Sequence, residues 1–344
     1  MKAMVLTGIR EMELRDVPDP AVQRPSDVLV RVKSVGVCGS DIHYYTKGRI
    51  GSQVVRHPFT VGHECSGIVA AVGRSVRRVS PGDRVAIDPA MFCGACDQCA
   101  KGRENTCREL RFLGCPGQAE GCLSERIVVP ESSCHRIPPT LSFDQATLSE
   151  PLSIAIYALK KAAPMEGARI AILGAGPIGL SVLLAAKLAG AAKVYATDKI
   201  PERLAVARRL GAHRTANPLE TDVVAEIAPL EPLGLDAVFE CSGDQEAVDQ
   251  AVRLLAPGGK LLAIGIPETA RFSFDVDDMR RKELRVENVR RQARCVEEAL
   301  RRIERHEIEV GDLVTHRFPF ERAKEAFDLV AEYRDGVVKA LIEL

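Results

Sequence analysis

The chain has 344 residues, more than one hydrophobic core usually supports, so two domains are expected. Hydrophobic residues make up 46% and charged residues 27%, as in ordinary soluble proteins. The 47 basic residues balance the 47 acidic ones, so the net charge provides no electrostatic case for binding nucleic acid or an anionic membrane.

The first 150 residues are rich in turns and strand-like segments. The N-terminal stretch MKAMVLTGIREMELR alternates as a strand does, and no secretory signal is expected there. Runs of Val and Ile, broken by Gly, Pro and Asp, follow at 28–38 and 67–87. This region is predicted to be an irregular β domain with long loops.

One loop of this region carries four cysteines, in the stretch CGACDQCAKGRENTC: Cys93, Cys96, Cys99 and Cys107. Four thiolates in one loop can close around a tetrahedral Zn²⁺ with no open position, which is the structural type of zinc site. Four free thiols are a poor alternative, because exposed thiols are reactive. A nucleic-acid-binding zinc ribbon is another alternative, but the loop lacks a basic, aromatic surface.

The chain has eleven cysteines, an odd number. In a long chain without a signal peptide this argues against a disulfide framework and for a reducing compartment. We therefore expect a cytoplasmic protein.

The stretch IAILGAGPIGLSVLLAA (170–186) is almost wholly apolar, but it is slightly short for a membrane span and contains three glycines and a proline. A buried strand that turns into a buried helix explains it better, so no membrane span is predicted. Its GAGPIG segment has the Gly-x-Gly-x-x-Gly form in the context that a dinucleotide site requires. Gly174 allows the turn, Gly176 lets the backbone approach a pyrophosphate, and Gly179 allows close helix–sheet packing. The alternative is a glycine turn in a nucleotide-free domain.

Asp198 ends the next predicted strand, 19 residues after Gly179, near the offset of about 20 residues expected for a ribose-binding acid. A carboxylate there accepts both ribose hydroxyls and repels a 2′-phosphate, which favours NAD over NADP. Lys199 and Arg203 are basic neighbours that weigh against this preference.

Strand-like and helix-like segments alternate from about residue 153 onwards, which predicts a parallel, doubly wound sheet. Two amphipathic helices and a final strand-like VVKALIEL follow. The pattern alone leaves open whether this tail returns to the first domain.

Possible ligands of a second metal ion are dispersed along the chain: Cys38 in GVCGSD, His63 and Glu64 in GHECSG, and Glu150 in SEPLSI. Taken singly, each has an ordinary structural explanation, such as a core cysteine or a hydrogen-bonded histidine. A metalloprotease helix is excluded, because the residue four places after His63 is Gly67.

The set gains weight from a resemblance. GHECSGIVAAVGRSV resembles the zinc signature of the medium-chain dehydrogenase/reductase family, the zinc alcohol dehydrogenases, and CGSD, the four-cysteine lobe, PGDRVAI, SEPLS and GAGPIG follow that family's order. The resemblance covers the whole chain. CGSDIHYYTKGRIG, SEPLSIAIYALKKA and VTHRFPFERAKEAF are most similar to the sorbitol and xylitol (polyol) dehydrogenase branch.

The resemblance implies an α/β fold with two domains. A GroES-like catalytic domain is expected at 1–152 and 291–344, with a structural zinc lobe at about 89–110. A Rossmann domain that binds NAD is expected at 153–290. A homo-oligomer, a tetramer or else a dimer, and a small-molecule alcohol substrate are also implied.

The resemblance also implies site residues. The catalytic Zn²⁺ is expected on Cys38, His63 and a carboxylate, either Glu64 or Glu150, the latter bound directly or through water. A proton relay is expected through Ser40 and His43, and substrate contacts through Tyr44, Glu150 and Arg290. The residues expected around NAD are Gly174, Gly176, Pro177, Ile178, Gly179, Asp198, Arg203, Ile264, Gly265, Ile266, Asn288, Val289 and Arg290.

The reaction expected from these parts is oxidation of a secondary alcohol, such as sorbitol or xylitol, to the ketone with hydride transfer to NAD. One departure from the branch pattern is NVRRQARC (288–295), where arginine, Arg291, replaces the usual tyrosine and Arg294 adds a further positive charge. Arginine forks suit carboxylates and phosphates, so Arg291 is an expected substrate contact and a sugar acid or polyol phosphate is an alternative substrate. The other explanation is that Arg291 and Arg294 face solvent or another subunit. Threonine dehydrogenase activity, or a non-catalytic nucleotide-binding role, are further alternatives.

Overall fold

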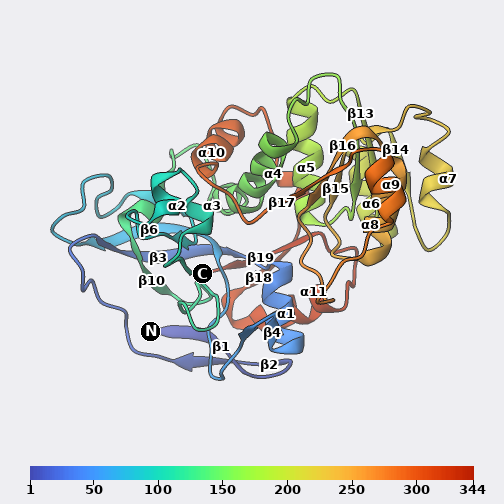
Figure 1. The fold of residues 1–344 in the computed structure, drawn as a ribbon. Helices are drawn as coiled ribbons and strands as arrows, with labels where there is room; N and C mark the ends of the chain where they lie inside the picture. The colour runs from blue at the N-terminus through green and yellow to red at the C-terminus, as the bar shows by residue number, and fades with distance from the viewer. The chain divides into compact units, whose positions relative to one another are not determined.

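The computed structural model describes all residues, 1–344, and the chain divides into two compact units (Figure 1). Unit 1 comprises Met1–Glu150, Val296–His306 and Val314–Leu344, and unit 2 comprises Pro151–Cys295 and Glu307–Leu313. The division differs from the expected boundaries at 152 and 291 by a few residues. It also assigns residues 307–313 to unit 2, because their contacts are made there.

Unit 1 is built on a seven-stranded sheet in which the order is β11-β7-β6-β3-β19-β18 and β10 also pairs with β3. Its strands are β3 (Asp27–Gly36), β6 (Glu64–Val72), β7 (Arg84–Ile87), β10 (Arg126–Pro130), β11 (Cys134–Arg136), β18 (Val314–Pro319) and β19 (Lys339–Glu343). The C-terminal strand β19 runs antiparallel to β3, with Leu341 opposite Gly36. The C-terminal segment thus belongs to the same sheet as β3, β6, β7, β10 and β11.

The remaining elements of unit 1 are short. They are β1 (Lys2–Gly8), β2 (Glu11–Asp16), α1 (Gly39–Lys47), β4 (Arg49–Ile50), β5 (Gln53–Val54), β8 (Ala90–Met91), α2 (Asp97–Ala100), η1 (Glu104–Thr106), β9 (Arg111–Phe112), η2 (Glu131–Ser133), α3 (Phe143–Thr147), α10 (Val296–Glu304), η4 (Phe320–Arg322) and α11 (Ala323–Ala331). Helix α4 (Ser149–Ala162) begins at the end of the first segment of unit 1.

Packing against α11 fixes helix α1 in unit 1. Tyr45 is fully buried, and its ring meets that of Phe327 edge-on, with centroids 5.5 Å apart. The single hydroxyl proton of Tyr45 faces two acceptors, Asp328 Oδ1 at 2.6 Å and the Arg10 carbonyl oxygen at 3.0 Å. Because buried aromatic pairs and satisfied hydroxyls resist displacement, the residues that α1 carries have a defined position.

Unit 2 is an all-parallel sheet of six strands in the order β14-β13-β12-β15-β16-β17. Its elements are β12 (Arg169–Leu173), α5 (Pro177–Leu188), β13 (Lys193–Thr197), α6 (Pro201–Arg209), β14 (Arg214–Ala216), α7 (Val223–Ile227), β15 (Leu235–Glu240), α8 (Gln245–Leu254), β16 (Leu255–Ala263), α9 (Val276–Arg281), β17 (Arg285–Asn288) and η3 (Gly311–Leu313). The predicted doubly wound sheet is confirmed.

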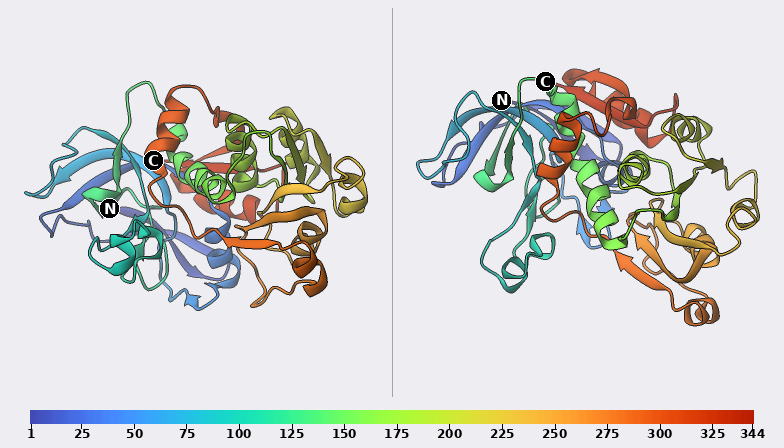
Figure 2. Two further views of the ribbon diagram at one scale, coloured as in Figure 1. Left: turned by 45° about the horizontal axis from the view of Figure 1, so that its top comes forward. Right: turned by 90° about the horizontal axis from the view of Figure 1, so that it is seen from above.

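The strand order in unit 2 reverses between β12 and β15. Because crossover connections between parallel strands are right-handed, the helices that follow β12 and those that follow β15 cover opposite faces of the sheet (Figures 1 and 2). In open α/β sheets, ligands bind outside the carboxyl ends of the strands at such a reversal of strand order. This edge is the expected place for a dinucleotide.

The apolar stretch at 170–186 is divided between β12 and α5, as the sequence indicates. None of the helices is both long enough and apolar enough to span a membrane.

Candidate metal and dinucleotide sites

Cys38 lies where β3 gives way to α1, in the position that caps the helix. Its backbone N–H donates to Asp41 Oδ2 over 3.2 Å, which closes the first turn of the helix. The thiol of Cys38 is partly exposed. The side chain therefore stands on a fixed backbone while its sulfur remains accessible.

His63 and Glu64 are neighbours that reach the same place. Glu64 is the first residue of β6, and His63 precedes the strand, so the alternation of a regular strand does not separate them. Gly62 has φ +97°, and a Cβ there would lie 3.2 Å from Cys122 Sγ and from Leu123 N. Only glycine fits that backbone comfortably.

The ligand atoms of Cys38, His63 and Glu64 all lie within 4.8 Å of one another. His63 and Glu64 are buried, whereas Cys38 is not. Thiolate sulfur, imidazole nitrogen and carboxylate oxygen are the donors that Zn²⁺ prefers, and three protein ligands leave a fourth position open, as catalytic zinc sites do. The donor set therefore fits a catalytic zinc ion.

Asp41 is a residue of this site that was missed from the sequence. It is fully buried, and its Oδ1 accepts from Gly62 N over 3.2 Å and lies 3.3 Å from His63 Nδ1. A carboxylate on Nδ1 fixes the tautomer that presents Nε2 to a metal. The available signal was the Asp in CGSD, three residues after a ligand cysteine.

Lys339 is the second residue that was missed. Its Nζ lies 2.9 Å and 2.7 Å from the two carboxylate oxygens of Glu64 and donates to the Val37 carbonyl over 3.1 Å. The side chains of Lys339 and Glu64 are each 1% exposed. The signal was a single charged residue within the apolar VVKALI, but nothing in the sequence connects it to Glu64.

The electrostatics of this region favour a cation. Burial lowers the pKa of His63, but the charges of Asp41 and Cys38 outweigh it and raise this pKa well above its ordinary value. Burial likewise lowers the pKa of Lys339, and Glu64 and Cys38 more than reverse the effect. The acidic groups of this site thus stabilise positive charge on His63 and Lys339, and a metal ion bound to His63 would take the place of its proton.

Glu150 is in the first turn of α4 and is 5% exposed. It lies outside the three-residue group, although His63 and Glu64 both act on its charge. Burial raises the pKa of Glu150 to about 7, with His63 lowering it and Glu64 raising it. Among the two predicted carboxylate ligands, Glu64 is the one whose oxygen lies near Cys38 and His63; a role for Glu150 stays a prediction.

Helix α1 carries the predicted relay and substrate residues. Ser40 and His43 are three residues apart and therefore share a face of the helix, and both are partly buried. Tyr44 is 4% exposed, and its hydroxyl donates to Gln53 Oε1 over 3.0 Å. Its predicted contact with substrate is not tested by this geometry.

The four-cysteine lobe is a separate donor group. The sulfur atoms lie 3.6 Å apart for Cys96–Cys99, 3.8 Å for Cys96–Cys107 and 3.5 Å for Cys93–Cys107. A tetrahedron with Zn–S bonds of about 2.3 Å has edges of about 3.8 Å. Backbone N–H groups, that of Arg108 foremost, lower the pKa of the Cys96 thiol to about 6, whereas burial and Cys96 raise the pKa of the Cys99 thiol to about 12, so the spacing of the sulfur atoms is what supports a metal here. The lobe therefore fits a closed structural zinc site.

The glycine-rich segment of unit 2 connects β12 to α5. Gly176 caps the helix and Pro177 occupies its first turn. A Cβ on Gly179 would lie 1.9 Å from the Gly174 carbonyl oxygen, so any other residue would displace the loop. The N–H groups at the start of α5, beside Ile178, are thus held for a pyrophosphate.

Asp198 follows β13 and is 9% exposed. Its Oδ2 accepts from Ala175 N over 2.8 Å, and its Oδ1 accepts from Ile200 N over 2.9 Å. Arg203 Nη1 lies 4.0 Å from Asp198 Oδ2. Because each carboxylate oxygen has a further lone pair, Asp198 retains acceptor capacity for ribose hydroxyls.

The other predicted cofactor residues also follow strands of this sheet. Ile264, Gly265 and Ile266 follow β16, Asn288 ends β17, and Val289 and Arg290 come next.

Glu240 is a further residue that was missed from the sequence, although it ends β15 as an isolated acid. It joins the loop after β15 to the segment after β16. Its Oε1 accepts from Ser242 N and Gly243 N, and its carbonyl accepts from Ile264 N and Gly265 N. Arg291 comes after Arg290 in a left-handed conformation, with φ 54°.

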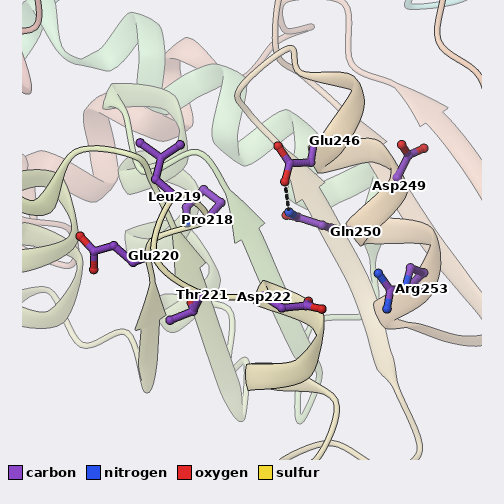
Figure 3. A pocket seen from close by; sticks show the side chains of 9 residues that line it. All are labelled: Pro218, Leu219, Glu220, Thr221, Asp222, Glu246, Asp249, Gln250 and Arg253. Atoms are coloured by element: carbon purple, nitrogen blue, oxygen red, sulfur yellow. Dashed lines mark hydrogen bonds between the residues drawn. The ribbon is translucent and has the colours of Figure 1, made fainter.

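A polar cavity of about 440 Å³ lies in unit 2 between the turn after β14 and helix α8 (Figure 3). Four carboxylates and one guanidinium line it, and Gln250 donates to Glu246. None of the predicted site residues takes part in it, so it is separate from both donor groups and from the glycine-rich loop.

Comparisons with known proteins agree with this geometry. Residues 24–139 match the alcohol dehydrogenase GroES-like domain, and residues 177–305 match the zinc-binding dehydrogenase family. Sorbitol dehydrogenase of Bacillus subtilis (strain 168) is 35% identical, over 99% of this chain and 97% of its own. L-idonate 5-dehydrogenase of Vitis vinifera is 33% identical, over 95% and 90% respectively.

A solved structure described as a zinc-binding dehydrogenase, from Sinorhizobium meliloti 1021 and bound to NADP, superposes with a TM-score of 0.90. It is 33% identical and covers 100% of this chain and 99% of its own. With these matches, the predictions of a structural zinc, a catalytic zinc and a nicotinamide dinucleotide are confirmed at the level of the family.

Replacing Cys107 with serine is expected to remove the structural zinc alone. Three remaining sulfurs bind Zn²⁺ less tightly than four, and the lobe would lose the ion that cross-links it. Metal analysis should fall from two zinc ions per chain to one, with faster proteolysis at 89–110. Cys241→Ser, the same change outside both groups, should keep both ions; two ions in Cys107→Ser would contradict the assignment.

Replacing Lys339 with methionine is expected to destabilise the metal-free protein by about 3–5 kcal/mol, because Glu64 is left buried without a partner. Urea unfolding measures this free energy. Adding Glu64→Gln should recover most of the loss. Lys2→Met, which breaks an exposed pair with Asp16, is the matched control and should change little. If Lys339→Met and Lys2→Met lowered the free energy of unfolding equally, the buried Lys339–Glu64 pair would not have the larger effect that its burial predicts.

Proposed function

Because the chain belongs to the zinc-containing medium-chain dehydrogenase/reductase family, it is a zinc- and nicotinamide-dinucleotide-dependent dehydrogenase, and we propose that it oxidises a secondary hydroxyl of a polyol to a ketone. The observation that carries this proposal is the group of sulfur, nitrogen and oxygen donors on Cys38, His63 and Glu64. The sorbitol dehydrogenase from B. subtilis, similar over nearly its whole length, supports a polyol as substrate.

The chain's residues divide the chemistry among them. When bound, Zn²⁺ supplies Lewis acidity that lowers the pKa of an alcohol, and the nicotinamide ring supplies the hydride acceptor. Cys38 and one carboxylate offset the positive charge of the ion, Asp41 holds the ring of His63, and Lys339 holds Glu64. Each of these contacts orients a donor before the substrate arrives, which reduces the reorganisation needed during reaction.

The hydroxyl proton needs a route outwards. Ser40 and His43 share a face of α1, and neither is fully buried. The Ser40 hydroxyl can donate and accept at once, and the imidazole of His43 can take a proton near neutral pH. We therefore propose these two residues as the relay, with His43 as the group nearer to solvent.

NAD is proposed as the dinucleotide. Asp198 follows the second strand of the nucleotide-binding motif, and its carboxylate would accept the adenosine ribose hydroxyls and repel a 2′-phosphate. The NADP in the S. meliloti structure belongs to that protein, and for this chain the choice depends on the charges near Asp198.

We also propose that the chain forms a homotetramer and that it is located in the cytoplasm. A homotetramer, as is usual in the polyol branch, would have about four times the 37.4 kDa of one chain. None of the eleven cysteines in the chain forms a disulfide, which is consistent with a reducing compartment such as the cytoplasm.

Replacing His63 with alanine is expected to lower kcat/KM by at least about 10³-fold, because a lost metal ligand removes several kcal/mol of transition-state stabilisation. Dinucleotide binding, followed by NADH fluorescence, should be retained because that site lies in unit 2. His316→Ala, a histidine change elsewhere in unit 1, should retain activity. Near-normal turnover in His63→Ala would contradict the metal assignment.

Activity assays with a panel of alcohols would identify the class of substrate. Sorbitol, xylitol, a sugar acid such as L-idonate, a polyol phosphate and threonine are each assayed for NADH formation. We expect the highest kcat/KM with a neutral polyol. Activity confined to the anionic compounds would instead favour recognition by Arg290, Arg291 and Arg294, in line with the L-idonate 5-dehydrogenase relative.

A further inference from the structure

An ion pair in unit 2 crosses the carboxyl edge of the parallel sheet. Lys199, after β13, places its Nζ 2.8 Å from Oδ2 of Asp244, which follows β15. These two strands flank β12 on opposite sides, so roughly 10 Å separates them at a strand spacing of about 4.8 Å. The pair therefore spans the switch point of the sheet, where open α/β sheets bind dinucleotides.

The segment beneath this pair is the glycine-rich loop. A Cβ on Gly174 would lie 3.0 Å from Ser242 N, so the loop after β12 touches the segment that leads to Asp244. On the other side, Asp198 accepts from Ala175 N within the same loop, and Lys199 is its neighbour in sequence. The ion pair therefore borders the place expected for the adenosine ribose.

The charged side chains near Asp198 differ in their exposure to solvent. Arg203 is 11% exposed, and its Nη1 lies 3.6 Å from a Cβ built on Gly176, which keeps it close to the loop. Lys199 is 50% exposed and Asp244 is 41% exposed. Asp244 Oδ1 also accepts from Glu246 N over 3.3 Å, which caps α8 and holds the carboxylate in place. Lys199 is thus the more exposed member of the pair, and the capping bond holds Asp244 in place.

We propose that Asp244 is a specificity-determining residue that favours NAD over NADP by holding the ammonium of Lys199. With the pair intact, a 2′-phosphate meets two carboxylates, those of Asp198 and Asp244, and a lysine already engaged. Without the Asp244 charge, Lys199 is released to pair with the phosphate. The inference rests on the proposed dinucleotide-dependent function, but it does not depend on which alcohol is oxidised.

The hydrogen bond from Lys199 agrees with this assignment, since it lowers the pKa of Asp244 and raises that of Lys199. Both groups are charged near neutral pH, so the pair is ionic. Because exposed ion pairs contribute little to folding, removing it is expected to leave the fold intact.

The test is Asp244→Asn in the full chain, titrated with NADPH and with NADH by calorimetry in the absence of any alcohol. Asparagine keeps the shape of the side chain and its capping oxygen. We expect NADPH to bind about tenfold more tightly than to the unsubstituted protein, the size of effect expected for one charge removed near a phosphate. NADH affinity should stay within about twofold, since its ribose carries no phosphate.

Two comparisons isolate the role of Lys199. In a Lys199→Met background, Asp244→Asn should yield less than a third of the NADPH gain, because no ammonium is released. Asp249→Asn makes the same charge change on α8, at a residue that lines the cavity of Figure 3 and takes no part in the pair. It should leave the preference between the dinucleotides unchanged.

The inference is wrong if Asp244→Asn leaves the ratio of NADPH to NADH affinity unchanged, or if the gain is equally large without Lys199. It is also wrong if the unsubstituted protein binds neither dinucleotide, a result that would overturn the dehydrogenase proposal as well.

If Asp244→Asn binds NADPH more tightly as expected but the protein oxidises no polyol, the inference is supported and only the proposed substrate is refuted. Asp244→Ser, which retains a capping oxygen, replaces the asparagine variant if that variant unfolds.

Discussion

The structure of unit 1 depends on how it balances charge in its interior. Asp41 and Glu64 are buried beside His63, and Lys339 is the buried cation that pairs with Glu64. Glu150 is also buried, and its charge is affected by His63 and Glu64. A buried charge without a partner costs several kcal/mol, so these carboxylates hold a proton on His63 in the metal-free protein, and a divalent cation would replace that proton. The same residues that make the interior costly without metal therefore make it a good metal site. Folding and metal binding are coupled through this balance.

The last strand of the chain supplies the partner of one of these interior charges. Lys339 is in β19, which pairs with β3 at Gly36, and Gly36 is opposite Glu64 in the pairing of β3 with β6. Adjacent strands bring the lysine to the carboxylate, although 275 residues separate the two in sequence. A Cβ on Gly36 would lie 2.1 Å from Glu64 Oε2, so the space for the carboxylate depends on a glycine in the intervening strand.

Unit 2 uses buried carboxylates differently. Asp198 follows β13 and Glu240 ends β15, on opposite sides of β12, and both accept hydrogen bonds from backbone N–H groups of the loops around them. These bonds shape the loops before any ligand binds, which is the condition for recognition without large reorganisation. The exposed pair between Lys199 and Asp244 adds an adjustable charge to an otherwise rigid edge. The backbone N–H groups at the start of α5 would bind the pyrophosphate that NAD and NADP share. The Lys199–Asp244 pair would distinguish NADP, which has a 2′-phosphate, from NAD, which has none.

Features carried by one short segment or by a repeating pattern of short segments could be predicted from the sequence: the four cysteines of the zinc lobe, the glycines at 174–179, and the alternation of strands and helices that produces the parallel sheet. Their geometry is local, so spacing alone carries it. Cys38, His63 and Glu64 were found through a family resemblance, because no spacing connects them. Asp41, Lys339, Glu240 and the Lys199–Asp244 pair required the tertiary structure. Each acts through a partner that strand pairing brings close, and the energy of a buried or bridging charge depends on that partner rather than on the residue's own sequence neighbours.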